Sequence, residues 1–165
     1  MLSSTTTAHQ PPRSPRATPP EIAALLDAVA GLWSRPSAYE DNGAHSGYRQ
    51  VQVVAGGTLR IPAAAPLLAP FEPIHDAWLS WIDPGGFVVE HIDAGPHYER
   101  WQIPLTEAGK LIQNGTAVAH EVGVAFRVHH DDWHSVRNDD PTPRVSLVID
   151  RAVIVSPART PLRRR

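Results

Sequence analysis

The sequence predicts a mainly β domain, a barrel or jelly roll with one helix in front of it. Apolar residues recur at helical spacing as far as Trp33, and from Thr58 onward they fall into short strand-like runs. Turn sequences separate these runs, above all Asp83-Pro84-Gly85-Gly86 and Asn114-Gly115. Many short strands at close spacing are typical of barrels and jelly rolls.

The expected helix begins at Thr18-Pro19-Pro20-Glu21, which supplies a capping Thr, Pro in the first turn and an early acidic residue. Apolar side chains then follow at helical spacing: Ile22, Leu25, Leu26, Val29, Leu32 and Trp33. The helix should end near Arg35-Pro36. Residues 37–57 hold turn residues and one short apolar run, Val51 to Val54, so we expect a loop that covers something.

The predicted strands are short runs rich in Val, Ile and Trp. They cover residues 59–61, 77–82, 87–92, 100–105, 110–113, 116–121, 124–128, 134–137 and 145–155. Residues 1–19 are rich in Ser, Thr and Pro, so they are expected to be disordered. Residues 157–165 form a basic tail, which leaves one folded domain at residues 20–156.

Composition excludes several classes of protein. A chain of 165 residues can bury one real core, and its net charge of -2 favours neither nucleic acid nor an acidic membrane. The absence of Cys excludes disulfides, thiolate metal sites and a cysteine nucleophile. No apolar run approaches the roughly 18 residues that a membrane span needs, and no secretory signal opens the chain. A cytoplasmic location is therefore expected.

Three residues form a candidate metal site. His91 and Asp93 are two residues apart, and residues i and i+2 of a strand point to the same face. His134, from a distant strand, would complete a triad with open coordination positions, the pattern favoured by non-haem Fe(II) oxygenases. A His-x-Asp sequence is common by chance, so the pair alone is a weak signal.

The surrounding residues strengthen this interpretation, because they resemble the two motifs of cupin proteins. The matching positions are Gly85, His91, Asp93 and Glu99 in the first motif, and Gly123, His134 and Asn138 in the second. Asp93 replaces a second His, His129 a usual Pro, and Asp131 a usual Gly. The resemblance implies a double-stranded β-helix, in which both motifs lie on adjacent strands and face into the barrel.

Two arginines stand at similar distances from the histidines. Arg100 follows His91 by nine residues, and Arg144 follows His134 by ten. Arg144 opens a run to Asp150 that is typical of a buried strand, where a cation needs an anionic partner. A carboxylate suits the guanidinium fork. On charge alone, a structural salt bridge within the barrel is the simpler explanation, whereas the spacing from His134 favours bound 2-oxoglutarate.

Taken together, these residues resemble the aspartyl/asparaginyl β-hydroxylase family of Fe(II)/2-oxoglutarate dioxygenases, including bacterial relatives that act on free amino acids. The matches span about seventy residues: Ser80, Pro84-Gly85, His91-Ile92-Asp93, Arg100, Ile103-Pro104-Leu105, Asp131-Asp132, His134, Asn138 and residues 144–150. Gln102 departs from the family, which often has a second His there.

The resemblance implies roles for six residues. His91, Asp93 and His134 would hold Fe(II). Arg144 with Ser80 would bind the distal carboxylate of 2-oxoglutarate. Arg100 would meet either the other end of this co-substrate or a carboxylate of the prime substrate.

The implied reaction hydroxylates an amino acid, free or as an Asp/Asn-type residue of a short peptide, with O2 consumed and succinate and CO2 formed. Two alternatives stay open: a metal-dependent cupin enzyme that uses no 2-oxoglutarate, and a non-catalytic cupin that binds a small ligand. The sequence does not identify the prime substrate.

Overall fold

The computed structural model describes residues 14–34, 44–93, 98–129 and 131–152. Disorder was expected for residues 1–19. Residues 1–13 and the basic tail expected at residues 157–165 lie outside the described residues, whereas residues 14–19 have a defined backbone. Residues 14–18 run extended beside the sheet, where the Ala17 amide donates to the Gly123 carbonyl at 2.7 Å. The Ala125 amide donates to the Pro15 carbonyl at 2.9 Å, so this segment pairs with residues 123–125 in the manner of a short antiparallel bridge.

The predicted helix is confirmed as α1 (Pro19–Val29), although it is shorter than expected. The Glu21 carboxylate accepts hydrogen bonds from both the backbone amide and the hydroxyl of Thr18, each at 2.7 Å. The predicted end near Arg35-Pro36 is wrong, because Ser34 has already left the helix. Its backbone exchanges two hydrogen bonds with Gln50, at 2.8 and 3.1 Å.

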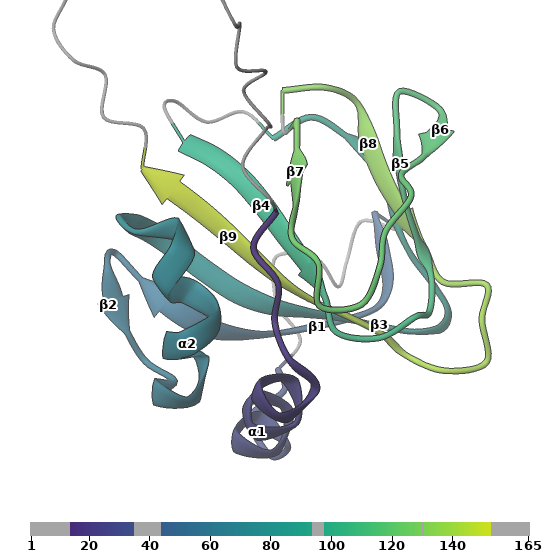
Figure 1. Cartoon of the computed structure of the whole chain (residues 1–165). Helices are drawn as coiled ribbons and strands as arrows, with labels where there is room; N and C mark the ends of the chain where they lie inside the picture. Colours follow the sequence, from purple (N-terminus) through teal and green to yellow (C-terminus); the bar gives the residue numbers. More distant parts are fainter. Residues whose placement is uncertain (1–13, 35–43, 94–97, 130, 153–165) are drawn as a thin grey trace, which may run out of the picture.

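The strands form one curled antiparallel sheet. They are β1 (His45–Ala55), β2 (Thr58–Leu59), β3 (Ile74–His91), β4 (Tyr98–Pro104), β5 (Lys110–Gln113), β6 (Thr116–Ala117), β7 (Phe126–Val128), β8 (His134–Arg137) and β9 (Arg144–Ala152). Their order is β6-β5-β8-β3-β9-β4-β7, with β1 paired to β3 and β2 to β1. Figure 1 shows the sheet curling into a half-barrel, which is consistent with the predicted jelly roll.

The loop predicted for residues 37–57 is wrong over residues 45–55, which form β1 and pair with β3 along most of its length. The apolar residues Val51, Val53 and Val54 are buried there. The first half of the strand is mostly polar, so its sequence did not indicate a strand. Residues 37–43 lie outside the described residues.

The turn predicted at residues 83–86 is also wrong, because β3 continues through it. At this point β3 exchanges one neighbour for another: residues 74–82 pair with β9, and residues 87–91 pair with β8. The backbones approach closely at this bend. A Cβ atom on Gly86 would lie 2.6 Å from the Ser46 carbonyl oxygen, so only glycine fits.

A second helical stretch was not predicted. It consists of η2 (Pro62–Ala64), α2 (Ala65–Leu68) and η3 (Ala69–Phe71). Each of these elements has Pro in its first turn, where the missing amide hydrogen costs no hydrogen bond. Their buried side chains are Ala64, Leu67, Leu68 and Phe71, a pattern too short to show helical periodicity.

The sheet has two different faces. In Figure 1, α1 and α2 cover one side, while β5, β7 and β8 rise on the other. The larger core joins the helices to the first side, for example through Leu25, Leu67, Leu79 and Leu147. A smaller core lies inside the curl and consists of Ile82, Val88, Leu111, Val128 and Val136. Within the described ranges, no helix has the length and apolar character needed to cross a membrane.

Candidate metal centre

Antiparallel pairing brings the two expected histidine ligands together. His91 is the last residue of β3 and His134 is the first residue of β8, and the two stand directly opposite each other in the register. Their ring centroids are 4.4 Å apart. Asp93 lies two residues beyond the end of β3, so the alternation of a strand does not by itself set its direction.

The three side chains have the geometry of a metal site. His91 Nε2 lies 3.4 Å from Asp93 Oδ1, and His134 Nε2 lies 3.4 Å from Asp93 Oδ2. One ligand atom from each residue lies within 4.8 Å of the others. Two ligand atoms about 2.1 Å from one ion would be separated by about 3.0 Å at a right angle and about 3.4 Å at the tetrahedral angle. The two histidine-to-carboxylate distances, which involve different oxygens of Asp93, match the tetrahedral value, so the three side chains could hold one ion.

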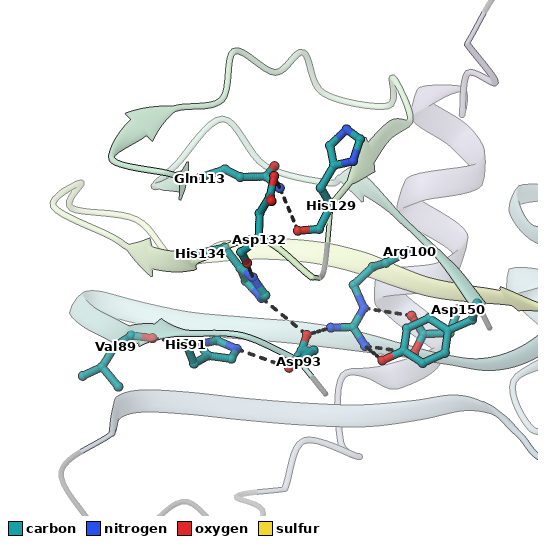
Figure 2. Close-up of polar contacts among 10 residues, drawn as sticks. Val89, His91, Asp93, Arg100, Gln113, His129, Asp132, His134 and Asp150 are labelled. Carbon is teal, nitrogen blue, oxygen red and sulfur yellow. Dashed lines mark hydrogen bonds and ion pairs between the residues drawn. The ribbon is translucent and has the colours of Figure 1, made fainter. Parts of the chain in front are cut away.

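The outer nitrogen of each histidine has a backbone partner. His91 Nδ1 lies 2.8 Å from the Val89 carbonyl oxygen, and His134 Nδ1 lies 2.9 Å from that of Asp132 (Figure 2). A carbonyl only accepts, so each Nδ1 carries the hydrogen and each Nε2 presents its lone pair to the centre. Burial lowers the pKa of His134, which favours the neutral, metal-binding form.

The triad opens onto a cavity inside the curled sheet. Its polar walls include His45, Tyr48, Trp78, Ser80, Arg100 and Gln102, and its apolar walls include Val88, Leu111, Val128, Val136 and Val148. The three ligands leave the cavity side open, so a metal ion there could still accept a small molecule.

Arg100 contacts two carboxylates of the protein. It was predicted to meet the co-substrate or the prime substrate. Its Nε and NH2 donate to the two oxygens of Asp150 at 2.8 and 2.9 Å, and its NH1 contacts Asp93 (Figure 2). The chain itself therefore supplies Arg100 with two carboxylates.

Arg144 is buried, with 3% of its surface exposed, on the face of β9 that also carries Val148 of the cavity. Its NH2 donates to Gln102 Oε1 at 3.1 Å, and in the described part of the chain no carboxylate lies within 4.0 Å of it. Burial lowers the pKa of Arg144 to about 10, an effect that Tyr48 partly opposes, so the guanidinium stays charged at neutral pH. Arg144 does not itself line the cavity, but Gln102 does.

Sequence reasoning missed two polar residues near this end of the cavity. Ser146 is fully buried opposite Ser80, and its hydroxyl has no hydrogen-bond partner among the described residues. Its position two residues after Arg144 could have placed both side chains on one strand face. His45 was missed because β1 was taken for a loop, yet it lines the cavity, and burial, followed by His91, lowers its pKa.

No protein-family model matches this sequence, and no curated protein matches it. Among solved structures, a predicted oxalate decarboxylase from Thermotoga maritima is similar with a TM-score of 0.51 and 16% identity, over 73% of this chain and 92% of that one. A cupin 2 conserved barrel domain protein from Salinispora arenicola has a TM-score of 0.46 and 16% identity, over 72% of this chain and 87% of that one.

An oxidoreductase of the 2OG-Fe(II) oxygenase family from Burkholderia pseudomallei has a TM-score of 0.49 and 20% identity, over 62% of this chain and 65% of that one. The Thermotoga similarity shows a shared fold and nothing about activity. The other two similarities are too weak to carry an argument. None of the three is described as an aspartyl/asparaginyl β-hydroxylase, so that resemblance rests on the residues of this chain.

Proposed function

We propose that this protein is an Fe(II)- and 2-oxoglutarate-dependent dioxygenase that hydroxylates an amino acid, either free or as an Asp/Asn-type residue of a short peptide. One observation carries the proposal. A cluster of two histidines and one carboxylate opens onto a cavity, and the wall of that cavity carries Gln102, which is hydrogen-bonded to the buried Arg144.

The ligand set of His91, Asp93 and His134 supports Fe(II). Two neutral imidazoles and one carboxylate, with an open side, are the set that non-haem Fe(II) oxygenases use. Bound Fe(II) would supply the activation of O2, coupled to conversion of 2-oxoglutarate into succinate and CO2 and to insertion of one oxygen atom into a substrate C–H bond. The protein residues would position both substrates and exclude water.

Arg144 supports a carboxylate ligand. A buried cation without an acidic partner is costly, and a bound carboxylate would complete the pair. Ser80 and Ser146 stand opposite each other on neighbouring strands, and their hydroxyls could donate to the same carboxylate. The Gln102 amide would then turn from Arg144 toward the ligand, so Gln102 would take part in co-substrate binding.

A second candidate is a metal-dependent cupin enzyme that uses no 2-oxoglutarate. It is favoured by the hydrogen bond from Arg144 to Gln102, because this bond satisfies part of the guanidinium without any ligand. A non-catalytic cupin is the third candidate, and the complete triad argues against it.

One experiment separates these candidates. Purified protein is loaded anaerobically with Fe(II), and 2-oxoglutarate is then added while the visible spectrum is recorded. A weak metal-to-ligand charge-transfer band that is absent from an Asp93→Ala control supports the dioxygenase. Metal binding without this band favours the second candidate, and absence of metal binding favours the third. Succinate formation, screened against free amino acids and short peptides, would then identify the prime substrate.

A further inference from the structure

Asp93 needs a support that the sheet does not provide. The backbone pairing of β3 ends at His91, and Asp93 lies two residues farther along the chain. Its Oδ1 lies 3.4 Å from His91, and its Oδ2 lies 3.4 Å from His134. Oδ2 also contacts the Arg100 guanidinium (Figure 2). Among the described residues, Arg100 supplies the permanent positive charge in contact with this carboxylate. The orientation of Asp93 therefore depends on where Arg100 is held.

Arg100 is itself held firmly. It stands directly opposite Asp150 in the pairing of β4 with β9, and the two side chains form a bidentate ion pair. The ring centroids of Trp78 and Tyr98 lie 5.0 and 5.3 Å from its guanidinium carbon, and its NH2 donates to the Tyr98 hydroxyl at 3.3 Å. The Arg100 side chain is 11% exposed. Two ordered strands thus determine where its remaining nitrogen points.

We propose that Arg100 is a positioning residue that orients Asp93 for metal binding, and that Asp150 holds the Arg100 side chain in place. Asp150 does not line the cavity, so it acts on the metal centre only through Arg100. This inference rests on the proposed metal centre and not on the use of 2-oxoglutarate.

The charges of the three side chains support this division of roles. A lone guanidinium beside Asp93 would compete with a divalent cation for the carboxylate and would repel that cation. Asp150 offsets the charge of Arg100 and occupies two of its three nitrogens. Asp93 can then contact the third nitrogen through one oxygen and still present a carboxylate oxygen to the metal ion.

The test is a titration of the metal-free full chain with Co(II) alone, without any co-substrate, followed by the visible absorption of the bound ion. We expect Asp150→Asn to weaken Co(II) binding by about tenfold to a hundredfold, the usual effect of losing a partner of a metal ligand. Arg100→Lys should weaken it comparably, because Lys keeps the charge but cannot bridge two carboxylates. In an Asp93→Ala background, Asp150→Asn should change the remaining affinity no further.

Glu99→Gln is the matched control. Glu99 precedes Arg100 on β4 and pairs on the outer face with Arg127 and Arg151, each at 3.5 Å. Loss of the Glu99 charge should leave Co(II) affinity unchanged. Thermal unfolding shows whether each variant is folded. If Asp150→Asn destabilises the fold, Arg100→Lys still decides the question.

Two results would overturn the inference while leaving the metal centre intact. One is wild-type Co(II) affinity in both Asp150→Asn and Arg100→Lys, which would return Arg100 to a role in binding the co-substrate or the prime substrate. The other is equal weakening by Glu99→Gln, which would mean general loosening of β4. A wild-type protein that binds no Co(II) would instead reject the metal centre itself, and the inference with it.

Discussion

Replacing Arg144 with Met tests the co-substrate assignment most directly. Arg144 is 3% exposed, has no carboxylate within 4.0 Å in the described part of the chain, and donates to Gln102. A 2-oxoglutarate carboxylate bound there would form a desolvated charge pair. Truncating one partner of such a pair costs about 2–5 kcal/mol. The affinity for 2-oxoglutarate should therefore fall by roughly thirty-fold to several thousand-fold.

The assay titrates 2-oxoglutarate into anaerobic, Fe(II)-loaded protein and follows the charge-transfer band. Fe(II) affinity should be nearly unchanged in Arg144→Met, because no hydrogen bond or ion pair joins Arg144 to the triad in the described residues. Arg144→Lys should recover only part of the loss, since Lys keeps the charge and loses the fork. If Arg144→Met bound 2-oxoglutarate as tightly as the wild type, we would reject the co-substrate assignment.

Asp93→Ala should weaken Co(II) binding and abolish hydroxylation, and full turnover in this variant would exclude Asp93 as a ligand. Gln102→Glu should place a carboxylate against Arg144 and lower 2-oxoglutarate affinity by at least about tenfold. An unchanged dissociation constant for 2-oxoglutarate would mean that the co-substrate does not contact Arg144. Gly109→Ala should lower the free energy of unfolding in urea by about 1–3 kcal/mol, because φ of Gly109 is +71° and the new Cβ would lie 2.5 Å from Arg144 Cδ. Wild-type stability would show that this segment shifts freely. Burial, followed by Asp150, raises the pKa of Tyr98 above its ordinary value of 10.0. Above that pH the unfolded chain releases the Tyr98 proton before the folded chain does, so the free energy of unfolding falls as pH rises. Urea melts from pH 8 to 11 should show a smaller loss of stability in Tyr98→Phe than in the wild type. Equal dependence of stability on pH in the two proteins would refute this.

Features that depend on a few neighbouring residues could be predicted from the sequence. The capping of α1 by Thr18 and Glu21 is one case, and the hairpin at Asn114-Gly115 is another. These two turn residues adopt φ of 48° and 75°, as a two-residue hairpin turn requires. The convergence of His91, Asp93 and His134 was also expected, because the motifs around them specify two strands that must meet.

Several other features needed the tertiary structure. The strand β1 has few apolar residues in its first half, and it exists because β3 offers a complementary backbone edge. The sequence 83–86 has the composition of a turn, yet it bends within one strand because β3 passes from β9 to β8 there. Backbone pairing with a distant partner overrides local preference in such places.

The sequence alone indicated which residues could hold a metal ion or bind a carboxylate, and the tertiary structure decided with which residues they interact. Arg100 and Asp150 are fifty positions apart, and only the register of β4 on β9 brings them together as an ion pair. Arg144 has the same residue type and a similar spacing from a histidine, but its place in the sheet leaves it with Gln102 and no carboxylate among the described residues. Local signals act over a few residues, whereas the partner of a buried charge is set by strand register across the whole fold.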